Sequence, residues 1–300
     1  MRPKGNGFER LRNAFAGVGL VIQFGTVGHN PQLTSTLLMK TTQVDNIQEA
    51  FKVAEGFPAP IGEKTFYAFR GHSNVDYNLA PSLWRVVRDG FESEEEVVDL
   101  EKRLTFEFRR RSRHHRPKAT EGFYTGSDSD CSTQDLWQTM QHHGSPTRLL
   151  DWTRSFYIAL YFAVVSSPDS DGAIVVIDTS AIENWANLKY DQKPPRLNAS
   201  ADVVSRPLLF TPTPNFERAI IQQGLFTMPT TILCDHDELF IEAHKRAGKE
   251  MEKVRIRKEC KPLLLSQLVA MNLTAATLFP GIDGIARSVQ ELALLAAADA

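Results

Sequence analysis

The chain of 300 residues has few cysteines, little net charge and no apolar run long enough to cross a membrane. Its three cysteines, Cys131, Cys234 and Cys260, are widely spaced and form no CxxC pair, which fits a reducing compartment better than a disulfide framework. The 34 Lys and Arg residues nearly balance the 36 Asp and Glu residues, so the overall charge predicts no broad attachment to nucleic acid or acidic membranes. The chain also lacks an HExxH motif and the Cys/His spacing of zinc sites, so we expect no metal.

The N-terminal region is irregular, because glycine and polar residues interrupt each of its apolar runs. We predict residues 1–40 as an N-terminal extension and residues 41–300 as one folded domain. The apolar stretch at residues 14–24 is too short to span a bilayer and ends without a clear cleavage site. We therefore expect a cytoplasmic protein that makes no membrane contact.

The rest of the chain mixes helical and strand patterns without regular alternation. Strand patterns occupy residues 65–70, 147–152, 172–178, 207–212, 224–228, 230–234 and 254–259. Helical patterns occupy residues 44–57, 94–116, 132–144, 155–167, 261–272 and 285–298. This order predicts an α+β fold, with a single domain built on a mixed, mostly antiparallel and either continuous or split sheet flanked by helices.

The first candidate motif is FRGH, Phe69 to His72, at the end of a predicted strand. Arg70 can clamp a phosphate or carboxylate through two parallel hydrogen bonds, and Gly71 leaves room for something bulky beside the backbone. His72 follows as a polar neighbour. The alternative is that Arg70 pairs with an internal carboxylate and closes the fold.

The second candidate motif is QHHGSPTRLLDWTRS, at residues 141–155. His142 and His143 are adjacent, so on a helix they point about 100° apart and are unsuited to chelating one metal together. Polar groups at strand ends are often functional, which makes candidates of Gln141, His143, Thr147, Arg148, Asp151, Trp152, Thr153 and Ser155. The alternative for Asp151 is structural: it caps the following helix or holds Arg148.

The third candidate motif is NFERAIIQQGLF, at residues 215–226. Glu217 is a candidate catalytic carboxylate, Arg218 and Gln223 are candidate binding residues, and Gly224 indicates close backbone approach or a bulge. Two other polar runs have simpler interpretations. The DHDEL run at 235–239 is predicted to be a solvated helix start, and the basic run Arg109 to Lys118 either contacts phosphates or forms a solvated helix end.

Together these motifs resemble a known family. YAFRGHSN at 67–74, the 141–163 segment, the GAIVVID strand and QQGLF at 222–226 are similar to the FRG domain, named after its Phe-Arg-Gly motif. The resemblance runs from about Val44 to Gly284 and implies a family that occurs in bacteria and phages. It does not by itself imply a defined activity.

A more distant resemblance links the chain to ADP-ribosyltransferases of the Arg-Ser-Glu class. Arg70 and Gly71 match the first part of that pattern, and Thr153 and Ser155 before an alanine-containing helix match the second. The resemblance implies that Arg70 holds the phosphates or ribose of NAD, that the hydroxyls brace the nicotinamide ribose, and that Glu217 stabilises the charge of the breaking glycosidic bond. It also implies that His72 or His143 orients a ribose hydroxyl. The chain departs from that class because it has no Ser-Thr-Ser triplet and no Glu-x-Glu or Gln-x-Glu loop.

Three functions follow as hypotheses. The first is an NAD-dependent ADP-ribosyltransferase-like or NAD glycohydrolase-like enzyme. The second is a non-catalytic module that binds a nucleotide or RNA phosphate, with a protein or nucleic-acid target contacted through Arg109 to Lys118. The third is a partner-interaction domain in which Arg148, Asp151 and Trp152 form a buried structural network.

Overall fold

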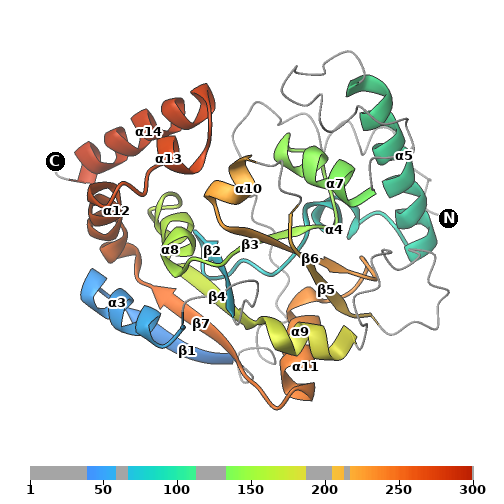
Figure 1. Ribbon diagram of the computed structural model, residues 1–300, viewed down its shortest axis with the longest axis horizontal. Helices are drawn as coiled ribbons and strands as arrows, with labels where there is room; N and C mark the ends of the chain where they lie inside the picture. The colour runs from blue at the N-terminus through green and yellow to red at the C-terminus, as the bar shows by residue number, and fades with distance from the viewer. Residues whose placement is uncertain (1–38, 59–66, 113–132, 187–204, 213–216, 299–300) are drawn as a thin grey trace, which may run out of the picture.

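The computed structural model describes residues 39–58, 67–112, 133–186, 205–212 and 217–298 (Figure 1). Its strands are β1 (Met39–Val44), β2 (Tyr67–His72), β3 (Leu150–Thr153), β4 (Gly172–Asp178), β5 (Pro207–Phe210), β6 (Gly224–Pro229) and β7 (Met251–Ile256). Its larger helices are α3 (Ile47–Glu55), α5 (Glu94–Ser112), α7 (Thr133–His142), α8 (Phe156–Val164), α9 (Thr179–Ala186), α11 (His236–Arg246), α12 (Lys261–Ala270) and α14 (Ile282–Ala298). Four shorter helical segments complete the described chain: α4 (Ser82–Val87), α10 (Glu217–Ile221), η3 (Lys258–Cys260) and α13 (Ala275–Leu278). The predicted N-terminal extension lies outside the described residues except for its last two positions, which begin β1.

The strands form one seven-stranded sheet in the order β1-β7-β4-β2-β3-β6-β5. Strands β1 and β7 are parallel, and all other neighbouring strands in this sheet are antiparallel. The predicted α+β fold with a mixed, mostly antiparallel sheet is therefore confirmed.

The sheet opens between β2 and β3. Strand β2 pairs with β4 along its whole length, from Tyr67 opposite Asp178 to His72 opposite Ala173. By contrast, β2 and β3 share a single register pair, Phe69 with Thr153. The backbones of Arg70 and Asp151 therefore lie just past the last paired residues, where side chains can enter between the two strands.

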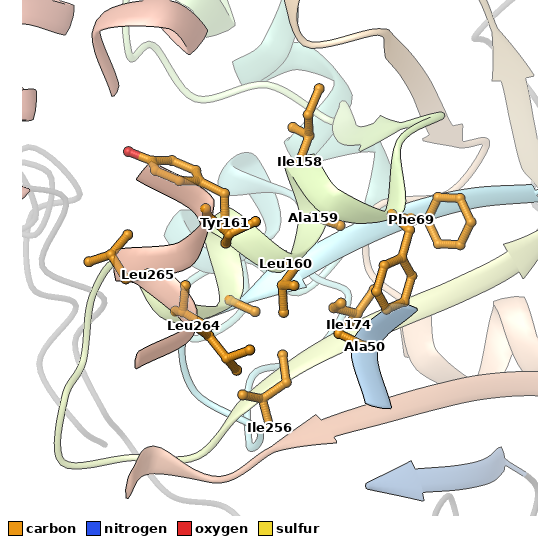
Figure 2. Packing of buried hydrophobic residues seen from close by; sticks show 14 of the residues in the cluster. Ala50, Phe69, Ile158, Ala159, Leu160, Tyr161, Ile174, Ile256, Leu264 and Leu265 are labelled. Carbon is orange, nitrogen blue, oxygen red and sulfur yellow. The ribbon is translucent and has the colours of Figure 1, made fainter. Parts of the chain in front are cut away.

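One face of the sheet packs against α8, which is apolar on nearly every side and lies over β2 and β4 (Figure 2). Phe69 and Ile174 from the sheet contact this helix cluster, and Leu264 of α12 extends it. A Cβ atom on Gly71 would overlap the carbonyl oxygen of Ala159. The room that we expected beside Gly71 is therefore filled by α8, and this glycine serves close helix-to-strand packing.

The opposite face of the sheet is covered by α9 and α11 (Figure 1). Trp152 lies in this layer, with its ring 5.5 Å from that of Phe240 and its Nε1 donating a 2.8 Å hydrogen bond to Thr227 Oγ1. A separate cluster joins α7 to β5 and β6 through residues such as Trp137 and Phe226. Its burial places the end of α7, with Gln141 to His143, beside β3.

Several predicted boundaries change in the structure. Strand β2 continues through Gly71 to His72, two residues beyond the predicted end. The predicted strand at 230–234 is wrong: this stretch forms no strand, because the backbone N–H groups of Ile232 and Leu233 bind the carboxylate of Glu94 on α5 at 2.8 and 2.9 Å. Gly144 has a positive φ of 79°, as its predicted position at a helix C-terminus requires.

Asn46 caps α3, in agreement with the predicted start of that helix: its side chain accepts a hydrogen bond from Glu49 N. Ser132, the predicted cap of α7, lies outside the described residues. Among the helices that the structure describes, none combines the length and apolarity needed to cross a bilayer.

Candidate anion-binding site

Arg148 lies wholly inside the protein. Its guanidinium has no exposed surface and faces the carboxylate of Glu101 on α5, with Nε 2.7 Å from Oε1 and Nη2 bonded to Oε2. Nη1 donates to the backbone carbonyls of Pro229 and Thr230, and the group lies 5.5 Å from the Trp137 ring centroid. Because the charge and most donors are matched, Arg148 has the contacts of a structural residue.

Arg70 occupies the opening between β2 and β3 and is half-buried. Its Nε donates a 3.0 Å hydrogen bond to His72 Nε2, and its Nη1 donates a 2.6 Å hydrogen bond to the backbone carbonyl of Asp151. Its Nη2 makes no hydrogen bond to the part of the chain that the structure describes. The guanidinium is thus anchored along one edge and keeps donors for a further acceptor.

His72 fixes the orientation of this guanidinium. Its ring is almost fully buried, and its Nε2 accepts from Arg70, so the proton of the neutral ring resides on Nδ1. Burial lowers the pKa of His72 well below its ordinary value, and the charges of Arg70 and Lys253 lower it further. His72 therefore stays neutral at pH 7, and its Nε2 accepts the hydrogen bond that keeps Arg70 in place.

Asp151 is an exposed carboxylate at the same opening. Gln141 Nε2 donates a 2.7 Å hydrogen bond to Asp151 Oδ2, and Gln141 Oε1 in turn accepts from the hydroxyl of buried Thr147. Desolvation lowers the pKa values of Arg70, Arg85 and Arg218, and the nearby negative charge of Asp151 opposes that lowering in all three. Three positive groups from three separate elements therefore gather around this carboxylate.

Arg85, on α4, is a site residue that the sequence did not indicate. Its Nη1 donates a 3.0 Å hydrogen bond to the carbonyl of Ala80, while the side chain remains exposed. Desolvation of the guanidinium lowers its pKa to about 10, and the nearby charge of Arg70 acts in the same direction. A pair of guanidinium groups that oppose one another's charge favours binding of an anion between them.

Asp237 and Lys253 hold the segment that joins β2 to α4. Lys253 Nζ donates a 2.6 Å hydrogen bond to the carbonyl of Val75, and Asp237 Oδ1 accepts from Leu79 N at 3.3 Å. Burial raises the pKa of Asp237 to about 6 and lowers that of Lys253. The predicted helix start at 235–239 is confirmed, since Asp235 caps α11, and Asp235 and Glu238 are exposed as expected. The prediction is wrong for two residues: His236 is almost fully buried, and Asp237 binds the backbone of Leu79.

The two predicted hydroxyl residues at the start of α8 are bonded within the protein. Thr153 is buried, and its Oγ1 donates to the carbonyl of Gln222 at 2.7 Å and accepts from Ser155 N at 3.0 Å. The Ser155 side chain caps α8 by accepting from Ile158 N. Both hydroxyls therefore stabilise the turn from β3 into α8.

The α10 residues lie at the border of the cluster. Glu217 is exposed and forms no hydrogen bond or ion pair with the residues that the structure describes, whereas the next residue, Arg218, is half-buried. Gln223 is exposed, has a positive φ of 49°, and its carbonyl accepts from Arg154 N. Arg218 is thus the α10 side chain that reaches the cluster.

The paired histidines lie at the end of α7, both exposed, with ring centroids 4.9 Å apart. Partial burial lowers the pKa of His142, and the charge of Arg218 lowers it further, so His142 is the histidine shown to lie near the arginines. His143, the predicted catalytic residue, is its solvent-exposed neighbour. No group of three or more His, Cys, Asp or Glu side chains in the described ranges is arranged to hold a metal.

The basic run is described only as far as the end of α5. Here Arg110 and Arg111 both contact Glu107, at 2.8 and 3.0 Å, so part of its charge is neutralised within the helix. The remainder of the predicted run, from residue 113 onwards, lies outside the described residues.

The comparison with protein families covers the central part of this site. Residues 65–172 match the FRG domain. The match supports the FRG resemblance over a shorter range than the motifs suggest, and it includes Arg70, His72, Arg85 and Asp151 while ending before Arg218. No curated protein and no solved structure matches the chain.

Proposed function

We propose that the protein binds a nucleotide through its phosphate groups, with Arg70 and Arg85 as the principal ligands of the diphosphate. The observation that carries this proposal is the Arg70 guanidinium, which is anchored by His72 and the Asp151 carbonyl while its Nη2 forms no hydrogen bond to the described residues. Such an anchored, planar donor suits phosphate, because less side-chain entropy is lost when the anion binds.

NAD is the nucleotide that the resemblance to ADP-ribosyltransferases favours. As an NAD glycohydrolase, the protein would break the bond between nicotinamide and ribose C1′ while water forms the new bond at C1′. The products are ADP-ribose, nicotinamide, which leaves with the bonding electrons, and one proton. Two carboxylates can stabilise the developing positive charge: Asp151 within the cluster and Glu217 beside Arg218. In a transferase, an acceptor group replaces the water.

Non-catalytic nucleotide binding is the second candidate, and the hydroxyl groups favour it. The resemblance needs Thr153 and Ser155 to brace the nicotinamide ribose, yet both hydroxyls already bond within the turn. In this candidate the arginines bind the phosphates of the nucleotide, and its glycosidic bond stays intact.

The two candidates share a binding test and differ in turnover. We expect NAD to raise the thermal unfolding temperature of the full chain, because a ligand that binds the folded state stabilises it. Arg85→Gln should weaken binding about tenfold, as expected for loss of a charge-assisted hydrogen bond. The matched control is Arg255→Gln. It removes a β7 arginine that forms an ion pair with Asp171, and this variant should bind NAD as the wild type does.

Nicotinamide release then separates the candidates. The enzyme is supported if wild-type protein releases nicotinamide and either Asp151→Asn or Glu217→Gln abolishes release while NAD still binds. Binding without release supports the non-catalytic module. Absence of NAD binding by folded wild-type protein contradicts both candidates for this nucleotide.

A nucleic-acid target contacted through Arg109 to Lys118 is a separate proposal. It predicts binding of RNA that weakens steeply with salt and depends on this run rather than on Arg70. Equal RNA affinity after replacing Arg109 and Lys118 with glutamine would contradict it.

A further inference from the structure

An apolar stripe lies exposed on α14, at the outer edge of the molecule (Figure 1). The described residues include nine exposed large apolar side chains, and five of them belong to this one helix. Four form the stripe: Ile282, Ile285, Val289 and Leu292 are 75%, 53%, 60% and 60% exposed. A surface helix ordinarily turns polar residues outward, and a contiguous apolar patch that stays exposed marks an interaction surface. The stripe therefore indicates an occupant that the described part of the chain does not supply.

The inner contacts of α14 hold this stripe toward solvent. Glu291 is almost fully buried, and its Oε1 accepts hydrogen bonds from Ala275 N at 2.8 Å and from the Tyr161 hydroxyl. Gly284 is buried as well, and a Cβ atom there would overlap the carbonyl oxygen of Phe279. Because these two inner residues fix the rotation of the helix about its axis, the fold itself sets the stripe on the surface.

The spacing of the stripe suits a second helix. Its four residues are separated by three, four and three positions, which are the intervals of the a and d residues that pack two helices along a common seam. The seam is short, because the 17 residues of α14 rise by only about 25 Å. An interface of this length lies near the lower limit for specific association, so we expect an affinity in the micromolar range.

The charge around the stripe narrows the choice of partner. Among the exposed residues of α14 up to position 296, Asp283 alone is charged, and Arg287 is half-buried. A helix that lies on a membrane surface carries several Lys and Arg residues beside its apolar face, and this part of α14 does not. A second copy of the chain is favoured instead, because a symmetric pair sets each surface against itself and an uncharged stripe does not repel its own copy.

The single exposed charge also selects the direction of pairing. A parallel pair would place the two Asp283 carboxylates at the same level, where they repel each other. An antiparallel pair that sets Ile282 against Leu292, and Ile285 against Val289, separates the carboxylates by about 12 Å along the helix axis, which exceeds the screening length of about 8 Å. It also aligns the two helix dipoles in opposite directions.

We propose that two copies of the chain associate through α14, with their stripes packed antiparallel about a twofold axis near residue 287. The dimer goes beyond the proposed nucleotide binding and does not depend on it. The stripe also lies outside the FRG segment, which ends at residue 172. Because the test reads molecular mass without a nucleotide, failure of either proposal leaves the other standing.

Sedimentation velocity of the full chain, at protein concentrations from about 1 to about 100 μM, tests the dimer. The wild type should shift from monomer to dimer as the concentration rises. Ile285→Lys and Val289→Glu should each weaken the dimer about tenfold or more, because each sets a charge against an apolar side chain of the second copy. Both positions are exposed in the single chain, so both variants should fold, which circular dichroism verifies. The matched control is Phe106→Lys, which changes an exposed apolar residue on α5 and should dimerise as the wild type does.

A mixture of the two variants tests the direction of pairing. In the antiparallel pair, Ile285 of one copy faces Val289 of the other. An equimolar mixture of Ile285→Lys and Val289→Glu should therefore recover a dimer, in which one such contact becomes an ion pair and the other stays apolar. A parallel pair sets like positions together, so the mixture would gain no such contact.

Three results would overturn the antiparallel dimer. They are a wild type that stays monomeric at the highest concentration, a dimer that survives both single variants, and a mixture that does not associate. A monomeric wild type that binds phosphatidylglycerol vesicles, and loses this binding in Val289→Glu, would overturn it in favour of a membrane surface.

Discussion

Arg148 and Arg70 are both arginines at strands of the same sheet, yet their surroundings differ completely. Arg148 has no exposed surface and is matched by the Glu101 carboxylate through two hydrogen bonds. Arg70 is half-buried and bonds to a neutral histidine and a backbone carbonyl, and it forms no ion pair with a carboxylate of the described residues. The first arrangement satisfies the guanidinium, whereas the second keeps part of its charge and its donors for another molecule.

The comparison teaches that the residue type alone does not assign a role in this motif-rich part of the chain. Both arginines lie in the segment that matches the FRG domain. What separates them is the presence of a buried carboxylate partner, since an ion pair sealed inside a protein supports the fold and an incompletely neutralised cation favours ligand binding.

The largest expected effect is on the free energy of unfolding, when the buried ion pair of Arg148 and Glu101 is broken. Arg148→Met should lower the free energy of unfolding by about 3–5 kcal/mol, because it leaves the Glu101 carboxylate buried without its partner. Urea denaturation measures this loss. The double variant Arg148→Met, Glu101→Leu should recover much of the stability, since it removes both charges together; a double variant as unstable as the single one would contradict the account.

A second prediction compares a buried histidine, His236, with an exposed one, His143. His236 is sealed inside, its Nε2 lies 3.2 Å from the Ile232 carbonyl, and burial lowers its pKa from 6.5 to about 4. His236 therefore binds a proton more readily in the unfolded chain than in the folded protein. Its contribution to the free energy of unfolding is complete above pH 6.5 and is lost as the pH falls toward 4. The loss amounts to at most about 3 kcal/mol.

His236→Gln should remove this part of the acid sensitivity, because glutamine does not titrate. The measurement is the unfolding free energy at pH 7 and pH 4.5 for both proteins. His143→Gln is the matched control, because that histidine is exposed, and its stability should follow the wild type across this range. An identical pH dependence for His236→Gln and wild type would rule out the assigned role of His236.

The smallest stability effect is expected at the candidate site. Arg85→Gln should change the unfolding free energy by less than about 1 kcal/mol, because Arg85 is exposed and is opposed by Arg70. Thermal denaturation without ligand measures the change. A loss as large as that of Arg148→Met would mean that Arg85 is structural, and the contrast between the two regions would disappear.

Local pattern in the sequence predicts most of the fold. The apolar runs that become β4 and α8 are unambiguous because they are buried on nearly all sides. The predicted strand at 230–234 fails for a tertiary reason: Glu94, which lies far away in the sequence, binds the backbone N–H groups that a strand would have needed. No local pattern carries that information.

The candidate site is predictable to a similar extent. Arg70, Gln141 and Asp151 follow from the motifs, and the structure brings them together. Arg85 could not be found, because a helical arginine near another arginine in space has no distinctive spacing in the sequence. The sequence also could not show that the hydroxyl of Thr153 is already bonded to the Gln222 carbonyl.

The most direct test of the account is a crystal structure of the protein grown with NAD. We predict the diphosphate at the opening between β2 and β3, with its oxygens about 3 Å from guanidinium nitrogens of both Arg70 and Arg85. NAD bound at another surface, with Arg70 holding only His72 and the Asp151 carbonyl, would contradict it.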